Sequence, residues 1–226
     1  MNKKKLTTDK SEFTVIAGCP SMGKTELALE VAYNEALHEQ KKVVYFTLGM
    51  PSEQLTKKLL CIISGISEKD FCDKNFNEQV FKSKWEKITE AANKLINLSL
   101  YIDPDPALCM KEIKSRIIKL MTSNQVNTVV IDYFQLIQPE VFESNCSNIA
   151  KMSKISKELK QLAKDLFISL TVVLNMDRHE AKQITPDHRE QIKYYLKEYG
   201  SIGEDADLII FIYREPSTLK SIIFEV

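Results

Sequence analysis

The sequence predicts an α/β fold in which a mostly parallel central sheet carries helices on both faces. Two observations lead to this prediction. Short apolar runs alternate with longer segments of helical periodicity, and this alternation is typical of a parallel sheet with crossover helices. A glycine-rich segment, Gly18 to Thr25, also lies directly between the first apolar run and the first helical segment. We therefore expect a sheet that is covered on both sides.

Length and composition are those of one globular domain. The chain has 226 residues, of which 44% are hydrophobic and 27% are charged, so disorder is not indicated and one large core can form. We expect a polar lead-in over residues 1–12 and a single domain over residues 13–226. No apolar run approaches the length that spans a bilayer. No apolar segment of a secretory signal precedes Phe13, so a cytoplasmic protein without membrane contact is expected.

The cysteines and the net charge limit the kinds of site that we expect. The cysteines are odd in number and lack C-x-x-C spacing, which favours reduced thiols over a disulfide frame or a zinc site; they are Cys19, Cys61, Cys72, Cys109 and Cys146. The formal net charge is zero. Any nucleic acid must therefore bind through a local patch.

Each expected element has its own signal along the chain. Apolar runs predict strands over residues 13–17, 43–48, 98–102, 128–131, 169–174 and 207–213, with 221–226 as an edge strand. Apolar residues at helical spacing predict helices over residues 24–37, from Pro51 onward, over most of 70–97, and over 111–121 and 149–166. Pro104 and Pro106 end the third strand, because proline cannot continue a sheet ladder. Trp85 is expected to be a packing anchor, and Ile118 to face the core.

The first chemical signal is a phosphate loop. The spacing G-x-x-x-x-G-K-[ST] is matched by Gly18, Cys19, Pro20, Ser21, Met22, Gly23, Lys24 and Thr25. The two glycines let the main chain curl so that its N–H groups and the helix N-terminus face the same phosphates. Lys24 adds charge at the outer phosphates, and the Thr25 hydroxyl can coordinate Mg²⁺. A glycine turn that merely caps a helix is the alternative, which the strand–loop–helix context disfavours.

The second signal is an acid at the end of an apolar strand. Val129, Val130 and Ile131 precede Asp132. Downstream of a phosphate loop, such an acid is typical of the Walker B aspartate, which holds Mg²⁺ at the carboxyl edge of the sheet. An acid that only caps a turn is the alternative, and the paired loop argues against it. The sequence thus predicts a nucleoside triphosphate site that uses Mg²⁺.

Several longer segments then follow one another in a fixed order: PSMGKT at 20–25, VVYFTLGMPSEQL at 43–55, LYIDPDP at 100–106, VIDYFQLI at 130–137, SKELKQLAKDL at 156–166 and GSIGEDADLIIFIYR at 200–214. In this combination the chain resembles the RecA-like motor domain of bacterial DnaB-type replicative helicases. The phosphate loop alone would not separate these from RecA or KaiC relatives. The resemblance implies a RecA-like P-loop NTPase fold and ATP-driven 5′ to 3′ translocation on single-stranded DNA by a hexameric ring.

The resemblance also assigns roles to single residues. Lys24, Thr25 and Asp132 match family positions for the phosphates and the metal ion, and Asn175 stands where the family has a glutamine that senses the γ-phosphate. Lys197, Glu198 and Gly200 stand at a family Arg-Glu-Ser-Gly segment that contacts DNA phosphates. Residues 177–195 match the family's second DNA-facing loop, with an ordinary polar loop as the alternative. The DNA-binding candidates are Arg178, Lys182, Arg189, Lys197, Glu198 and Gly200.

Two departures from the family pattern bear on hydrolysis. Gly49 stands where the family has a glutamate that polarises the attacking water, and loss of a general base typically costs about 10²- to 10⁴-fold in rate. The 12 residues after Arg214 contain Lys220 and no arginine, whereas the family has an arginine finger there. Only 12 residues precede Phe13, where the family has an N-terminal domain and a linker helix. We therefore expect impaired turnover and weaker ring formation.

Two main hypotheses remain open. In the first, the chain is an ATP- and Mg²⁺-binding helicase motor that binds single-stranded DNA weakly and hydrolyses ATP slowly or not at all. In the second, it is a helicase-derived protein that binds ATP and replication partners without unwinding DNA. A small-molecule kinase is a third reading, disfavoured because no arginine-rich lid follows the phosphate loop. DNA-stimulated ATP turnover would separate the first two.

Overall fold

The fold is a seven-stranded sheet between two layers of helices. The computed structural model describes residues 11–72, 78–123, 125–138, 147–177, 189–215 and 218–225. The sheet order is β3-β2-β4-β5-β1-β6-β7. The first six strands in this order are parallel and β7 pairs antiparallel with β6. The strands are β1 (Phe13–Gly18), β2 (Val43–Thr47), β3 (Leu100–Asp103), β4 (Thr128–Asp132), β5 (Ser169–Asn175), β6 (Leu208–Glu215) and β7 (Thr218–Glu225).

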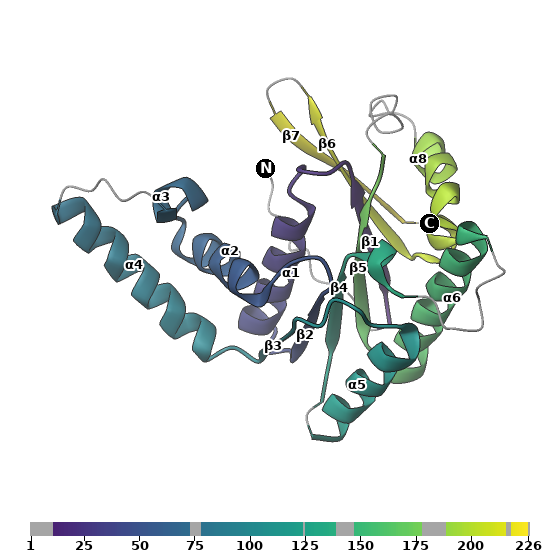
Figure 1. Ribbon diagram of the computed structural model, residues 1–226, viewed down its shortest axis with the longest axis horizontal. Coiled ribbons are helices and arrows are strands. Elements are labelled where there is room, and N and C mark those ends of the chain that lie inside the picture. The colour runs from purple at the N-terminus through teal and green to yellow at the C-terminus, as the bar shows by residue number, and fades with distance from the viewer. Residues whose placement is uncertain are drawn as a thin grey trace.

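The helices confirm the predicted two-sided covering. Figure 1 shows α1 and α2 on one side of the sheet and α5, α6 and α8 on the other. In the same view α4 extends away from the sheet and packs against α2. The helices are α1 (Lys24–His38), α2 (Ser52–Ser64), α3 (Glu68–Cys72), α4 (Glu78–Ile96), α5 (Met110–Ser123), α6 (Asn148–Leu166), α8 (Arg189–Leu196) and α9 (Ile202–Asp205), with 3-10 turns η1 (Phe134–Leu136) and η3 (Lys197–Tyr199).

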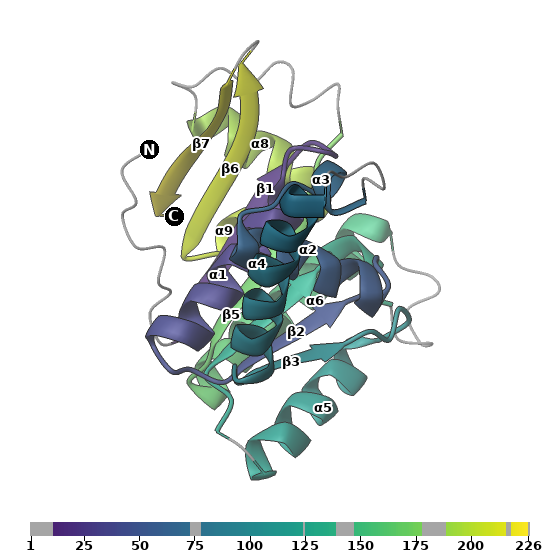
Figure 2. The same cartoon turned by 90° about the vertical axis from the view of Figure 1, so that its left-hand side faces the viewer.

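The core consists of two apolar layers, one on each face of the sheet. Because side chains alternate along a strand, Val43 and Tyr45 of β2 face α1 while Val44 and Phe46 face α5 and α6. The central strands are buried on both faces, as expected for parallel strands covered by helices. Figure 2 shows β6 and β7 forming one border of the sheet and β3 lying at the other.

Local chemistry sets the ends of several helices. At the start of α6 the Ser147 hydroxyl accepts a hydrogen bond of 3.2 Å from the Ala150 N–H, which is an N-cap. At the end of α2, Gly65 has a φ of 70°, and its N–H donates to the Cys61 carbonyl oxygen. A left-handed C-cap of this kind suits glycine, which has no Cβ to clash.

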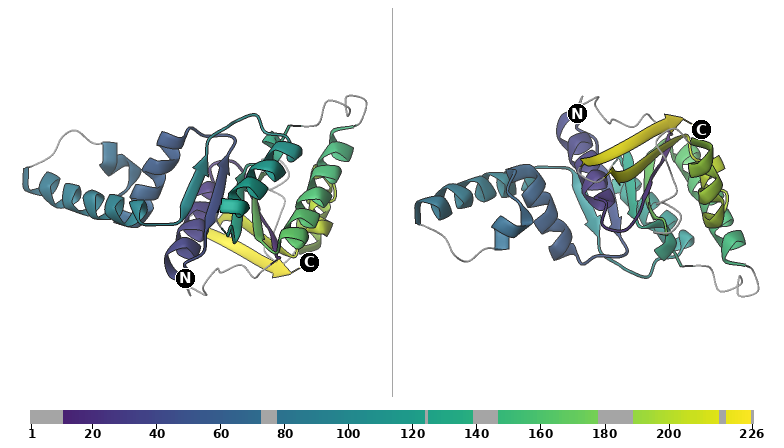
Figure 3. Two further views of the ribbon diagram at one scale, coloured as in Figure 1. Left: turned by 90° about the horizontal axis from the view of Figure 1, so that it is seen from below. Right: turned by 90° about the horizontal axis from the view of Figure 1, so that it is seen from above.

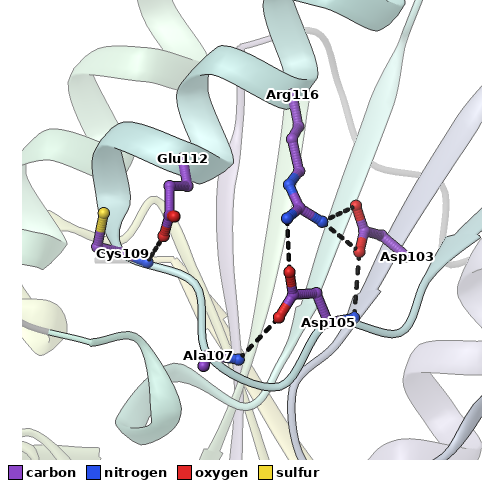
Figure 4. Close-up of polar contacts among 6 residues, drawn as sticks. All are labelled: Asp103, Asp105, Ala107, Cys109, Glu112 and Arg116. Atoms are coloured by element: carbon purple, nitrogen blue, oxygen red, sulfur yellow. Dashed lines mark hydrogen bonds and ion pairs between the residues drawn. The ribbon is translucent and has the colours of Figure 1, made fainter.

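The connection between β3 and α5 is braced by one arginine. The Arg116 guanidinium of α5 donates to both carboxylate oxygens of Asp103, at 2.8 and 2.7 Å, and to Asp105 at 2.6 Å (Figure 4). The Asp105 carboxylate also accepts the Ala107 N–H at 3.2 Å. The pKa of Asp105 lies below its usual range, first because of the hydrogen bond from Arg116. The predicted proline stop after the third strand is therefore also an ion-paired loop.

Two sequence-based expectations about packing are wrong. Trp85 is 60% exposed on α4 and does not anchor a core; in Figure 3 the helix that carries it projects well beyond the sheet. Ile118 is 41% exposed, although Ile113 and Ile117 on the same helix are fully buried. Both errors have one cause, since helical spacing indicates a face but not which element covers it. In the described part of the chain, no helix has the length and apolarity that crossing a membrane requires.

Candidate nucleotide-binding site

The phosphate loop leaves the sheet at the carboxyl end of β1. Gly18 pairs with Asn175 of β5 on one side and Ile212 of β6 on the other. A Cβ on Gly18 would stand 2.4 Å from the Ile212 carbonyl oxygen, so this strand end requires glycine. Gly23 has a φ of 84° at the N-cap of α1, in the left-handed region that favours glycine. The two glycines of the motif thus bring the chain from a central strand directly into a helix N-terminus.

Lys24 is the buried cation of this loop. Its side chain is 5% exposed, and its Nζ donates to the Cys19 carbonyl oxygen of the same loop. Burial lowers the pKa of Lys24 to about 8, and the charge of Asp132 partly offsets that fall. A buried ammonium that now bonds to a loop carbonyl is suited to exchange that partner for a phosphate oxygen.

Asp132 lies at the end of β4, and its two carboxylate oxygens differ. Oδ2 accepts a hydrogen bond of 3.0 Å from the Tyr45 hydroxyl. Oδ1 is buried and has no hydrogen-bond partner within the described residues. Burial raises the pKa of Asp132, and the hydroxyls of Thr25 and Tyr45 offset part of that rise. Burial also raises the pKa of the Tyr45 phenol well above its ordinary value, with the Asp132 charge adding to the effect, so the phenol remains a donor.

These residues fit a magnesium ion. Mg²⁺ prefers oxygen ligands and is usually bound by one or two protein groups together with water and substrate phosphates. The orphaned Oδ1 of Asp132 and the Thr25 hydroxyl, which interacts with the same carboxylate, are groups of this kind. Among the described residues no three His, Cys, Asp or Glu side chains gather around a possible metal position. Water and phosphate oxygens would supply the other ligands of such an ion.

A pocket of about 540 Å³ is lined by the predicted residues Pro20 to Thr25 and Asn175, together with residues that were not predicted. Asn175, at the end of β5, contributes to its wall, and the Gln135 side chain holds the Asn175 main chain by donating to its carbonyl oxygen and accepting its N–H. Lys58 also lines the pocket while contacting Glu26 at 2.5 Å and Glu68 at 2.6 Å. The lining residues are Pro20, Ser21, Met22, Gly23, Lys24, Thr25, Glu26, Met50, Gln54, Lys58, Tyr133 and Asn175.

Gly49 lies against the ring of Tyr133. A Cβ built on Gly49 would stand 2.6 Å from both Cζ and Oη of that ring. The space in which a longer side chain would begin is therefore occupied by the phenol. Glu53, the next acid along the chain, lines a neighbouring hollow of about 430 Å³ that also contains Pro104 and Pro106. It is not among the residues that line the nucleotide pocket.

The predicted DNA-binding residues are only partly described. Arg178 and Lys182 lie outside the described residues, and Arg189 begins α8. Lys197 and Glu198 are exposed on η3, whose Tyr199 hydroxyl accepts the Asp177 N–H at 3.1 Å. Gly200 packs on α6, where a Cβ would stand 2.5 Å from the Ser153 nitrogen. Close packing against α6 thus explains why glycine stands at position 200. The hydrogen bond from Asp177 to Tyr199 places the exposed turn beside the end of β5.

Sequence reasoning missed residues of the pocket lining and of its support; they are Glu26, Met50, Gln54, Lys58 and Tyr133 in the lining, and Tyr45 and Gln135 in the support. Gln135 and Tyr133 stood inside the VIDYFQLI segment, and proximity to Asp132 could have singled them out. Tyr45 and Lys58 carried no local signal. Their partners lie on other elements, so the contacts depend on the pairing of β2 with β4 and on the packing of α2 against α1.

Fold and site together define the class of protein. A phosphate loop joins β1 to α1, and an acid stands at the end of a strand separated from β1 by β5, both at the carboxyl edge of a parallel sheet. This is the site of an α/β P-loop nucleotide-binding domain. The chain belongs to the DnaB-like helicase C-terminal domain family, whose model matches residues 2–222.

Individual relatives agree with this family. The replicative DNA helicase DnaC of Bacillus subtilis (strain 168) is 32% identical over 207 residues, which is 91% of this chain and 44% of that protein. The replicative DNA helicase DnaB of Buchnera aphidicola (subsp. Acyrthosiphon pisum, strain APS) is 33% identical over 230 residues, 98% of this chain and 48% of that protein. The chain therefore spans about half the length of these curated relatives.

Solved structures share the fold. A DnaB-like replicative helicase, described with its interactions with primase, superposes with a TM-score of 0.79 at 26% identity and covers 95% of this chain and 52% of that one. A second solved structure, described as an ATPase domain, superposes with a TM-score of 0.77 at 24% identity, covering 95% of this chain and 77% of that one. The predicted RecA-like fold class is confirmed.

Proposed function

We propose that this chain is the motor domain of a replicative DNA helicase, which binds ATP with Mg²⁺ and uses its hydrolysis to move along single-stranded DNA. The observation that carries the proposal is that Lys24, which lines the pocket, lies close enough to Asp132 for their charges to interact, with an Asp132 oxygen left without a hydrogen-bond partner in the described structure. Membership of the DnaB-like family supports the same assignment.

Each nucleotide-site residue has a proposed task. Main-chain N–H groups of residues 18–25 and the N-terminus of α1 bind the phosphates. Lys24 moves its Nζ from the Cys19 carbonyl to the outer phosphates, while Thr25 and Asp132 hold the metal ion. When bound, Mg²⁺ neutralises charge on the β- and γ-phosphate oxygens. Asn175 contacts the γ-phosphate side and is kept in place through its main chain by Gln135.

The proposed DNA contact lies on the far side of Asn175. Lys197 and Glu198 are exposed on a turn that the Tyr199 hydroxyl ties to Asp177, two residues beyond Asn175. A change of contact at the γ-phosphate thus has a short path to this turn, along the main chain to Asp177 and through its hydrogen bond to Tyr199. Lys197 binds a phosphate as a point charge, without the two-pronged geometry of an arginine. Arg178, Lys182 and Arg189 are proposed to add charge to the same contact.

Assembly and partners are also proposals. From the resemblance to DnaB-type helicases we propose that the protein acts as a ring of several copies around single-stranded DNA. One such structure describes interactions with primase, and we extend a contact with replication proteins of this kind to the present chain.

The decisive experiment is phosphate release from ATP with and without a single-stranded oligonucleotide, with Lys24→Ala as the control. Stimulation by DNA that disappears in Lys24→Ala is the expected result. Tight ATP binding without turnover would point to a helicase-derived binding protein, and phosphoryl transfer to a nucleoside or a sugar would point to a kinase. Mass photometry with nucleotide and DNA tests the ring independently.

A further inference from the structure

The side chain that holds the proposed metal ligand comes from another strand. Of the two Asp132 oxygens, Oδ2 is bonded to the Tyr45 hydroxyl and Oδ1 is left without a hydrogen-bond partner among the described residues. This asymmetry matters because a carboxylate can rotate about its last bond. A donor that fixes one oxygen also fixes the direction of the other.

The sheet register explains why Tyr45 reaches this carboxylate. Thr47 of β2 pairs with Asp132 of β4, so Tyr45 is the diagonal neighbour on the same face, within reach of a long side chain. The Thr47 hydroxyl donates instead to the Met50 carbonyl oxygen at 2.7 Å. Tyr45 is therefore the β2 residue whose hydroxyl is directed at Asp132.

Tyr45 is also the largest of the fully buried side chains. Its ring belongs to the apolar layer between the sheet and α1, where a phenylalanine would fill nearly the same volume. A buried phenol usually finds some hydrogen-bond partner, so a purely structural role must be weighed against a functional one. The two roles differ in one consequence, since only the functional role makes metal affinity depend on the hydroxyl.

We propose that Tyr45 is a positioning residue of the metal site: its hydroxyl holds Asp132 through Oδ2, so that Oδ1 stays available, together with the Thr25 hydroxyl, to the divalent cation of a bound nucleotide. The inference rests on the proposed ATP and Mg²⁺ site. Outer partners of this kind orient a metal ligand, and their removal typically weakens metal binding about 10- to 100-fold.

The test uses the full chain and the variant Tyr45→Phe, which removes one hydroxyl and keeps the ring. Binding of the ATP analogue AMP-PNP is measured without divalent metal, and Mn²⁺ binding to the AMP-PNP complex is then measured by electron paramagnetic resonance. We expect unchanged affinity for metal-free AMP-PNP and a roughly 10-fold weaker Mn²⁺ affinity. The matched control is Tyr33→Phe, a partly buried tyrosine that packs on the same apolar layer from α1 and should change neither value.

The outcomes separate the inference from the proposed function. Unchanged Mn²⁺ affinity in Tyr45→Phe, or an equal loss of metal-free AMP-PNP binding, would overturn the positioning role. Failure of the unaltered chain to bind AMP-PNP would overturn the proposed function as well. If Tyr45→Phe is unstable at the assay temperature, all variants are measured with a stabilising osmolyte, which favours the folded state. As a second measurement, the double variant Tyr45→Phe/Asp132→Asn is compared with Asp132→Asn. No further loss of Mn²⁺ affinity supports action through Asp132, and an additive loss contradicts it.

Discussion

The two walls of the nucleotide pocket are built differently. The first, which we call the phosphate wall, contains the loop Gly18 to Thr25 with Asp132 and Tyr45 behind it, and buried polar groups lie there within reach of a bound phosphate or metal ion. The second wall contains Met50, Tyr133 and Asn175, and Gly49 lies against Tyr133 from the neighbouring hollow. There a glycine contacts a phenol ring, and neither the glycine nor the asparagine amide can take a proton from water.

This difference separates binding from chemistry. Phosphate binding depends on main-chain geometry and on one buried cation, both of which the phosphate wall has. We expect activation of water to need an acceptor near the second wall, and Gly49, which lies against Tyr133 there, supplies no side chain. We therefore expect nucleotide affinity and turnover to respond to different substitutions, and the predictions below test that independence.

The largest effect is expected from giving the second wall an acid. Gly49→Glu supplies a carboxylate near the outer phosphate and should raise ATP turnover by about 10²-fold, the lower end of what a general base contributes. Because the new Cβ would stand 2.6 Å from the Tyr133 ring, that ring must turn aside, at a cost typical of overpacking, about 1–3 kcal/mol of stability. Steady-state phosphate release and thermal unfolding measure the two effects.

Gly49→Ala is the matched control for that substitution. It introduces the same steric contact without a carboxylate, so it should lower stability to the same extent and leave turnover unchanged. Equal turnover in the alanine and glutamate variants would show that residue 49 does not face the attacking water.

The phosphate wall is tested by Lys24→Ala. A hydrogen bond to a charged group is worth about 1.5–3 kcal/mol, so ATP affinity should fall about 10- to 150-fold. Isothermal titration calorimetry measures this, with Lys57→Ala on α2 as a control that changes a lysine not among the residues lining the pocket. Unchanged affinity in Lys24→Ala would remove the basis for the nucleotide site itself.

The two walls also differ in how much of each could be predicted from the sequence. The phosphate loop was predictable because its function is encoded in consecutive residues, and the strand–helix alternation was predictable because buried parallel strands and amphipathic helices have different periods. Asp132 was predictable from the apolar strand before it. The phosphate wall is thus largely a local property of the chain.

The contacts of Tyr45 and Tyr133 could not be predicted, because they join residues that are distant in sequence or depend on the course of a turn. Tyr45 and Asp132 are 87 positions apart, and they meet only because β2 and β4 pair in one register. The prediction that Trp85 is a packing anchor was wrong for a related reason, since the burial of a side chain depends on which element covers its helix. DNA binding by Arg178 and Lys182 remains a prediction, and so does the DNA-binding role of the residues around them.

A smaller effect is expected where the second wall continues toward the proposed DNA contact. Gly200→Ala places a Cβ 2.5 Å from the Ser153 nitrogen at a φ of 78°, and should lower the free energy of unfolding by about 1–3 kcal/mol. Lys197→Ala, on the exposed part of the same turn, should leave unfolding unchanged and weaken binding of a single-stranded oligonucleotide. Chemical denaturation and fluorescence anisotropy separate the two. Equal stability of both variants would contradict the packing role of Gly200.

The smallest effect concerns the support of the second wall and depends on pH. Pro104 and Pro106 share a hollow with Gly49, and Arg116 holds the loop that carries them through Asp103 and Asp105. Because the hydrogen bond from Arg116 lowers the folded-state pKa of Asp105 below its unfolded value, this pairing stabilises the fold above about pH 4, and the stabilisation is lost as the pH falls through the folded pKa. The difference in unfolding free energy between the unaltered chain and Arg116→Gln should thus be constant from pH 5 to 7 and narrow below about pH 4.

A carbon-13 NMR titration tests the same ion pair directly. In Arg116→Gln the pKa of Asp105 should rise toward that of an ordinary aspartate, whereas Arg116→Lys should retain part of the shift because lysine keeps the charge but lacks the two-pronged guanidinium. A stability gap that stayed constant on acidification would mean that Arg116 acts on this loop by packing alone.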